Sequence, residues 1–160
     1  MNRERYAALM KWGEDHSAQK KILCLLNKIL PFLLAIIYGL ALLLCTFVYP
    51  VLLINLILRP VLCFLFVTVV RYMLKFPRPY DVYNIMPMCD YHPGKMRSFP
   101  SRHTACAAII AFEIFRLWNF IGLIAIVLAI LIGLLRIVCG NHFIKDVALA
   151  FGIAFLCSLV

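Results

Sequence analysis

Residues 29–58, with the sequence ILPFLLAIIYGLALLLCTFVYPVLLINLIL, form a stretch of thirty residues without a charged side chain. A helix of about 20 apolar residues is long enough to cross the ~30 Å hydrocarbon core of a lipid bilayer. Pro50 lies inside the stretch, and proline is favoured in the first turn of a new helix. We therefore predict two membrane-spanning helices, at about residues 27–48 and 51–74.

The composition of the chain excludes a soluble globular domain. Apolar residues make up 65% of the 160 residues and charged residues only 14%, whereas soluble domains have about 45–50% and about 25%. A chain of this length leaves a large share of its surface exposed and cannot bury so much apolar area within itself. The bilayer can cover this surface, so the sequence predicts an all-α integral membrane protein.

Three more apolar segments follow a long loop. The loop covers residues 75–101, and the apolar segments cover about residues 102–117, 119–138 and 141–160. Residues 1–21 mix charges with a few apolar side chains, which is typical of an amphipathic helix on the membrane surface; a frayed tail is the alternative. The predicted fold is a polytopic transmembrane helical bundle of about five spans in residues 22–160, preceded by this amphipathic helix.

The charge of the chain is strongly positive, with 16 Lys and Arg against 7 Asp and Glu. Such an excess indicates nucleic acid, anionic lipid head groups or an anionic substrate as a partner. Nucleic acid is disfavoured, because the basic residues are scattered between apolar runs. The seven cysteines include no C-x-x-C pair, so they indicate buried thiols rather than a zinc site or a disulfide framework.

Polar residues gather where the predicted spans begin or end. They form three groups: Arg71 and Arg78; Ser101, Arg102 and His103; and Arg136, His142 and Asp146. Two spans separate the first group from the third, and the second group begins the span directly after the loop. All three groups are therefore expected on the same side of the membrane.

The arginines in these groups predict an anion. Several guanidinium groups at one depth are costly unless an anion lies among them, and the planar guanidinium suits phosphate oxygens. Pro100, just inside a predicted helix start, leaves the backbone N–H groups of residues 101–104 available to an anion as well. Together these features predict a phosphate site.

The histidines predict chemistry at that site. His142 and Asp146 are four residues apart and so share one face of a helix. A carboxylate there can hold one ring nitrogen protonated and leave the other as a nucleophile or base. His103 is a second titratable group, able to protonate a departing oxygen. A metal bound by the two histidines is disfavoured, because the neighbouring side chains are mostly cationic.

At this point the sequence resembles the type 2 phosphatidic acid phosphatase (PAP2) superfamily, whose signatures are Lys-x6-Arg-Pro, Pro-Ser-Gly-His and Ser-Arg-x5-His-x3-Asp. The corresponding stretches here are Arg71-x6-Arg78-Pro79, Pro100-Ser101-Arg102-His103 and Leu135-Arg136-x5-His142-x3-Asp146. The resemblance covers roughly residues 50–150, with the motifs in order and every internal spacing kept. The resemblance implies that residues 22–160 form a PAP2-like catalytic domain with residues 75–101 as its active-site loop.

The resemblance implies a metal-independent phosphatase that needs no cofactor and works through a phosphohistidine. His142 would attack phosphorus and Asp146 would orient it, while His103 would protonate the leaving group and later activate water. The side chains implied to hold the phosphate oxygens are those of Arg71, Arg78, Ser101 and Arg136, assisted by backbone N–H groups near Arg102, whose own guanidinium is a further candidate for substrate contact.

Three residues depart from the family pattern. Arg71 stands in place of lysine, which keeps the charge and changes the hydrogen-bond geometry; Lys75, one turn later, is an alternative for that role. Arg102 replaces glycine and adds a guanidinium. Leu135 replaces serine and removes a hydroxyl. The nucleophile, its orienting carboxylate and the acid are all present, so we expect an active enzyme whose substrate preference these departures affect most.

The expected activity is hydrolysis of a lipid phosphomonoester or pyrophosphate. The candidate substrates are phosphatidic acid, phosphatidylglycerophosphate, an isoprenyl pyrophosphate and a phosphorylated glycolipid. Two alternatives remain open: a lipid phosphotransferase that uses the same site, and a catalytically silent scaffold that binds anionic lipids. The small size suggests a multi-pass protein of a bacterial plasma membrane. The sequence leaves the lipid and the oligomeric state undetermined.

Two sets of observations place the catalytic side differently. Six basic residues precede the first span: Arg3, Arg5, Lys11, Lys20, Lys21 and Lys28. The positive-inside rule places such a segment in the cytoplasm, and the arrangement of five spans then puts the catalytic side there too. The family resemblance instead favours the outer face of the plasma membrane.

A few charged or aromatic residues fall outside the motifs. Arg59 and Glu113 lie inside predicted spans at matching depths, which predicts an ion pair; Arg116 is a competing partner for Glu113. We expect Lys95 and Arg97 to attract anionic lipid. The remaining polar and aromatic loop residues are expected to be mainly solvated: Tyr80, Asp81, Tyr83, Asp90 and Tyr91.

Overall fold

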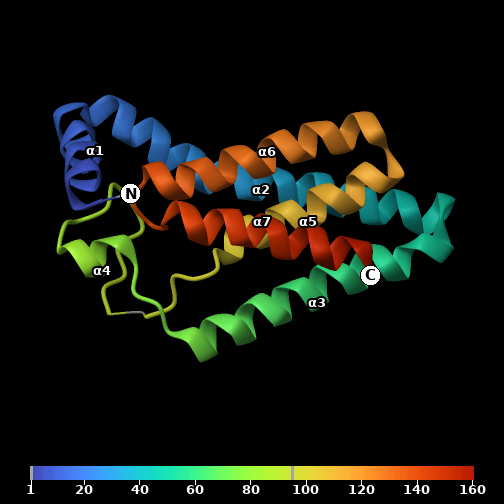
Figure 1. Ribbon diagram of the computed structural model, residues 1–160. Coiled ribbons are helices and arrows are strands. Elements are labelled where there is room, and N and C mark those ends of the chain that lie inside the picture. The colour runs from blue at the N-terminus through green and yellow to red at the C-terminus, as the bar shows by residue number, and fades with distance from the viewer. Residues whose placement is uncertain (1, 95) are drawn as a thin grey trace.

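A computed structural model describes residues 2–94 and 96–160 and shows an all-α bundle (Figure 1). The helices are α1 Arg3–Asp15, α2 Ser17–Val48, α3 Pro50–Leu74, α4 Pro79–Tyr83, α5 Arg102–Leu117, α6 Asn119–Val138 and α7 Ile144–Leu159. Four of the five segments predicted as spans lie within helices, the fifth overlaps α7 except at its ends, and Pro50 occupies the first turn of α3 as expected. Lys95, for which we predict lipid attraction, lies outside the described residues.

Two helix starts differ from the prediction. α2 begins at Ser17, so the first apolar run continues a helix that starts well before residue 27. α7 begins at Ile144 instead of residue 141, because Gly140 adopts a left-handed φ of 80° and the chain turns there. His142 therefore lies in the turn between α6 and α7, and the expectation that it shares a helix with Asp146 is wrong.

The apolar helices fit a helical membrane bundle. Three helical stretches are long and apolar enough to cross a bilayer among the described residues: Ser17–Val48, Pro50–Tyr83 and Asn119–Val138. α5 and α7 contain 16 residues each, which corresponds to ~24 Å at the rise of an α-helix. These two are shorter than the ~30 Å hydrocarbon core.

Small residues let the helices pack closely around α5. The buried side chains between α5, α6 and α7 are largely alanines: Ala105, Ala107, Ala108, Ala111, Ala125, Ala129, Ala150 and Ala154. Gly122 of α6 lies directly on α5, since a Cβ there would be 2.1 Å from Cα of Phe115. Small residues of this kind allow close backbone approach in membranes. The buried Ala105, Ala107 and Ala108 pack the first half of α5, which carries Arg102 and His103 at its start.

An ion pair joins α3 and α5 inside the bundle. Arg59 Nη1 lies 3.1 Å from Glu113 Oε2, which confirms the predicted pair. Arg116 lies 3.7 Å from the other carboxylate oxygen, so Glu113 has both candidate partners. The carboxylate is buried and would be costly without these positive charges.

The loop and the N-terminal helix lie at one end of the bundle, and the C-terminus lies towards the other (Figure 1). α1 is the expected amphipathic helix, but its apolar residues Tyr6 and Met10 are buried against the protein. The expectation of a solvated loop is wrong for two residues. Tyr80 is buried in the same cluster, and Asp90 forms an ion pair with Arg136.

Candidate active site

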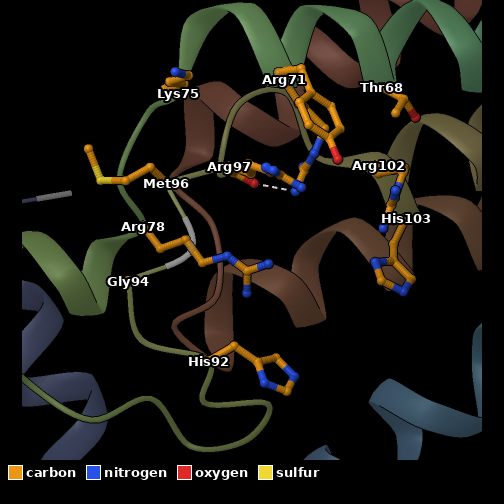
Figure 2. Close-up of a pocket in the computed structure, with 11 residues that line it drawn as sticks. Thr68, Arg71, Lys75, Arg78, His92, Gly94, Met96, Arg97, Arg102 and His103 are labelled. Atoms are coloured by element: carbon orange, nitrogen blue, oxygen red, sulfur yellow. Dashed lines mark hydrogen bonds between the residues drawn. The ribbon is translucent and has the colours of Figure 1, made fainter.

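A cavity of about 620 Å³ opens at the loop end of the bundle (Figure 2). Its lining residues come from α3, the loop and the start of α5: Thr68, Arg71, Tyr72, Lys75, Arg78, His92, Gly94, Met96, Arg97, Arg102 and His103. Of the predicted site residues, Arg71, Arg78, Arg102 and His103 line it. In the part of the chain that the structure describes, no aspartate or glutamate does.

Among the residues that the structure describes, the cavity walls concentrate positive charge and include no acidic side chain. Figure 2 shows the Arg78 side chain reaching into the space between Arg71 and His92. Arg78 Nε is buried without a hydrogen-bond partner in the structure, and its guanidinium lies 5.7 Å from the Tyr80 ring centre. Converging guanidinium groups of this kind are stabilised by an anion with several oxygens, such as phosphate.

His142 and Asp146 form a buried pair beside this cavity. His142 Nδ1 lies 3.2 Å from Asp146 Oδ2, and both side chains are almost completely buried. A carboxylate only accepts hydrogen bonds, so Nδ1 is the protonated nitrogen and Nε2 keeps a lone pair. The same carboxylate oxygen accepts the Phe143 N–H at 3.1 Å. The i, i+4 spacing therefore gives the predicted contact, although His142 precedes the helix.

The surroundings of His142 keep its ring neutral. The pKa of His142 is lowered from 6.5 to about 4, mainly by burial and with smaller contributions from the charges of Arg78 and Arg71. Asp146 opposes this effect and raises the pKa. The ring is neutral at physiological pH, which is the form in which Nε2 can act as a nucleophile.

Ser98 is a site residue that the sequence did not reveal. Its hydroxyl donates to Asp146 Oδ2 and lies 3.3 Å from His142 Nδ1, and the side chain is fully buried. Ser98 lies two residues before the Pro-Ser-Arg-His motif, and a serine in a loop carries no signal of such a contact. The structure adds it to the pair as a third member.

Arg71 braces the loop that carries Ser98. Its guanidinium donates to the carbonyl oxygen of Ser98 at 3.2 Å, to that of Pro100 at 2.6 Å, and to that of Arg97. Arg71 thus places a positive charge on the cavity wall. Its hydrogen bonds hold the segment just before α5 in place. Its role in phosphate binding stays a prediction, and its hydrogen bonds to the loop were not predicted.

Arg136 holds the turn that carries His142. Its backbone carbonyl accepts the N–H groups of Asn141 at 3.0 Å and His142 at 3.1 Å. Its guanidinium pairs with Asp90 at 3.0 Å, and Asp90 also accepts from Asn27 Nδ2 at 2.7 Å. Arg136 is buried, and the residues that line the cavity do not include it.

Ser101 joins the starts of α5 and α7. Its hydroxyl lies 2.9 Å from the Thr104 hydroxyl, and its N–H donates to the Asp146 carbonyl at 3.0 Å. The first backbone bond of α5 runs from Ala105 N–H to Ser101 O. The N–H groups of residues 102–104 precede this ladder and face outward from the helix start. The Ser101 N–H, which we expected to be available to an anion, is occupied.

Arg102 and His103 also line a second, mainly apolar cavity of about 370 Å³. Its other lining residues belong to α2, α3 and α5: Pro31, Leu34, Ala35, Phe64, Cys106, Ala107 and Ile110. The Arg102 guanidinium lies 5.5 Å from the Phe64 ring centre. The cationic cavity and the apolar cavity thus meet at these two residues.

This fold and this site define a class: helical membrane proteins with a cationic pocket beside a carboxylate-backed histidine. Residues 34–160 match the PAP2 superfamily, and the chain belongs to this superfamily. Among solved structures it is similar to a transmembrane PAP2 type phosphatidylglycerolphosphate phosphatase from Bacillus subtilis, with 24% identity and a TM-score of 0.59. The match covers 88% of this chain and 73% of that one and shows a shared fold. Comparison with curated protein sequences gave no match.

Proposed function

We propose that this protein is a membrane lipid phosphatase that hydrolyses a lipid phosphomonoester or pyrophosphate through a phosphohistidine on His142. The observation that carries the proposal is the meeting of the cationic and apolar cavities at Arg102 and His103. A substrate with a phosphorylated head and an apolar tail has the two chemical parts that these two spaces suit.

The head group belongs in the cationic cavity. Arg71, Arg78 and Arg102 supply positive charge on its walls, and guanidinium groups bind phosphate oxygens with two parallel hydrogen bonds. The N–H groups at the start of α5 add donors at a helix N-terminus, where an anion is favoured. This arrangement stabilises the charge that spreads over the phosphoryl oxygens during transfer.

The lipid tail belongs in the apolar cavity. Leu34, Phe64 and Ile110 are among the side chains that line it, and α2 and α3 expose apolar residues on their outer faces to the bilayer. A tail lying there remains in an apolar environment while the phosphate reaches the arginines. If the lipid tail did not need this cavity, soluble phosphate esters would be hydrolysed as fast as lipid phosphates.

The proposed chemistry takes two displacements. Nε2 of His142 forms a bond to phosphorus, the phosphorus–oxygen bond to the lipid breaks, and the departing oxygen takes a proton from His103. Water then attacks the phosphoryl group, gives a proton to His103 and releases phosphate, so that His142 regains its lone pair. Asp146 keeps Nδ1 protonated and stabilises the positive charge on the ring during both steps.

We also propose that all five long helices cross the membrane. α5 is packed between α3, α6 and α7 and so needs little direct contact with lipid. Five crossings place the N-terminus on the catalytic side, which agrees with the packing of α1 against the loop. The proposed location is a bacterial plasma membrane.

The test is phosphate release by purified protein in detergent with EDTA present. Phosphatidylglycerophosphate comes first, because the similar Bacillus subtilis structure carries that activity in its name; phosphatidic acid and an isoprenyl pyrophosphate complete the panel. The proposal is supported if wild type releases phosphate, His142→Ala does not, and His16→Ala, a control at an exposed histidine, still does. Transfer to a lipid acceptor instead of water indicates the phosphotransferase, and lipid binding without turnover indicates the scaffold.

A further inference from the structure

The N-terminal helix α1 contacts the turn that carries His142. Tyr6 is fully buried, and its hydroxyl donates to the Gly140 carbonyl at 3.2 Å. A Cβ at Gly140 would lie 2.7 Å from Tyr6 Oη and 3.0 Å from Met10 Sδ. α1 therefore packs directly on the backbone two residues before His142, where Gly140 has a left-handed φ of 80°.

A second path connects α1 to the residue after His142. The Tyr6 ring centre lies 5.3 Å from that of Tyr83, and the Tyr83 ring centre lies 6.0 Å from that of Phe143. Phe143 follows His142 and is the N-cap residue of α7. The side chain of Tyr6 thus contacts the turn on one side of His142 directly and on the other side through Tyr83.

A strap, defined here as residues 85–90, lies between α1 and the end of α6. Gly13 of α1 approaches Met88 so closely that a Cβ would lie 2.8 Å from Met88 Cε. The Met88 N–H donates to the Cys139 carbonyl at 3.1 Å, and Asp90 at the end of the strap pairs with Arg136. The strap therefore contacts α1 on one side and the end of α6, where the same turn begins, on the other.

The exposed part of α1 is the opposite face. Tyr6, Met10 and Gly13 follow one another at helical spacing and are buried, whereas Trp12 is 40% exposed. A helix that only lay on the membrane would direct its apolar side chains into lipid. The residues of α1 that the structure describes do not line the cationic cavity.

We propose that α1 is a positioning element for the nucleophile: Tyr6, Met10 and Gly13 hold the 139–143 turn so that His142 keeps its attack geometry. This inference rests on the proposed function of the site. Because α1 does not touch the place where the phosphate binds, loss of the docking is expected to lower kcat and leave KM nearly unchanged. A misplacement of about 1 Å can lower a rate on the order of 100-fold.

The test compares Tyr6→Phe, which removes one hydroxyl and keeps the ring, with Tyr38→Phe. Tyr38 is a matched control, because its hydroxyl donates to the Leu56 carbonyl at 2.8 Å between α2 and α3. We expect Tyr6→Phe to lower kcat roughly 5- to 10-fold with KM within about twofold, consistent with one lost hydrogen bond. Tyr38→Phe is expected to keep the wild-type kcat.

A double-mutant cycle separates positioning from general stability. Gly140→Ala strains the turn and also meets Tyr6 Oη, so its effect on kcat is expected to be smaller in the Tyr6→Phe background than in wild type. Additive losses, or equal losses of kcat in Tyr6→Phe and Tyr38→Phe, would overturn the inference.

Hydrogen exchange of the peptide covering residues 139–143 gives a readout that does not depend on turnover. Faster exchange there in Tyr6→Phe, and unchanged exchange in Tyr38→Phe, is the expected result. If wild type releases phosphate and both exchange and kcat are unaffected in Tyr6→Phe, the positioning role is wrong. If wild type releases no phosphate from any lipid, the proposed function fails instead, whatever the exchange shows.

Discussion

The Ser98 hydroxyl donates to the Asp146 carboxylate and lies 3.3 Å from Nδ1 of His142. One hydroxyl from the loop therefore contacts both members of the pair that carries the proposed chemistry. Arg71 holds the carbonyl of Ser98 from α3, so the first sequence motif is connected to the third through the loop between them. The orientation of His142 depends on residues from α3, the loop and α7 together.

The Ser98→Ala variant tests whether the Ser98 hydroxyl orients Asp146 and His142. Asp146 Oδ1 has no hydrogen-bond partner in the structure, so the donors to Oδ2 fix the carboxylate. Loss of a hydrogen bond to a charged acceptor is worth ~1.5 kcal/mol or more, and we expect kcat to fall at least about tenfold. Asp146→Asn should lower kcat much more, since it also removes the charge that stabilises the imidazolium. In steady-state kinetics, a lowered kcat with unchanged KM would support a role of Ser98 in holding Asp146. A wild-type kcat in Ser98→Ala would contradict it.

The Arg71→Lys variant tests the hydrogen bonds from Arg71 to the loop carbonyls. A lysine restores the residue of the family pattern but has one point-like ammonium, which cannot reproduce the fork that reaches three carbonyls. We expect faster proteolysis within residues 84–101 and a kcat lowered about tenfold by the loosened Ser98. If Arg71→Lys behaves as wild type in both measurements, the charge of Arg71 is what matters and its carbonyl contacts do not.

Glu113→Gln tests the ion pair inside the bundle. It leaves Arg59 without its partner at 3.1 Å, and breaking a buried pair typically costs about 3–5 kcal/mol. We expect a clearly lower Tm in detergent, whereas Arg116→Gln should have a small effect because Arg116 is half-exposed and more distant. The exchange Arg59→Glu with Glu113→Arg should recover part of the lost Tm. No recovery would argue against the pair as the main stabilising contact.

The stability of the protein should depend on His142 at mildly acidic pH. The pKa of His142 is lowered from 6.5 to about 4 in the folded protein, so between these values the unfolded chain binds a proton that the folded chain does not. Stability is then fully present above about pH 6.5 and falls towards pH 4, by up to about 3 kcal/mol. Tm measured across this range should fall less steeply in His142→Gln than in wild type. Equal slopes would show that the pKa is not lowered.

Much of the fold could be predicted because the apolar runs are long and their ends are marked. Pro50 starts α3 where expected, and the charged pair Arg59 and Glu113 was placed by counting residues along two antiparallel helices. The start of α7 could not be predicted in this way. The Gly140-Asn141 pair marks a turn, but it does not show that the chain stays non-helical until Ile144.

The site was predicted to the extent that its residues occur in motifs. Arg78 and His103 line the cavity as expected, and His142 contacts Asp146. The contacts of Ser98, Asp90 and Tyr6 are hydrogen bonds between segments far apart in the chain, and each depends on how the loop folds back over the bundle. No local pattern distinguishes these residues from other polar or aromatic residues in a loop or an amphipathic helix.

The central claim is that His142 carries the phosphoryl group during turnover. The most direct measurement is mass spectrometry of protein quenched under alkaline conditions within the first turnover on phosphatidylglycerophosphate or another lipid phosphate that it hydrolyses. The account predicts one acid-labile phosphoryl group on the peptide that contains His142, and none in His142→Ala. Rapid phosphate release without any phosphorylated peptide, or with the phosphoryl group on another residue, would contradict it.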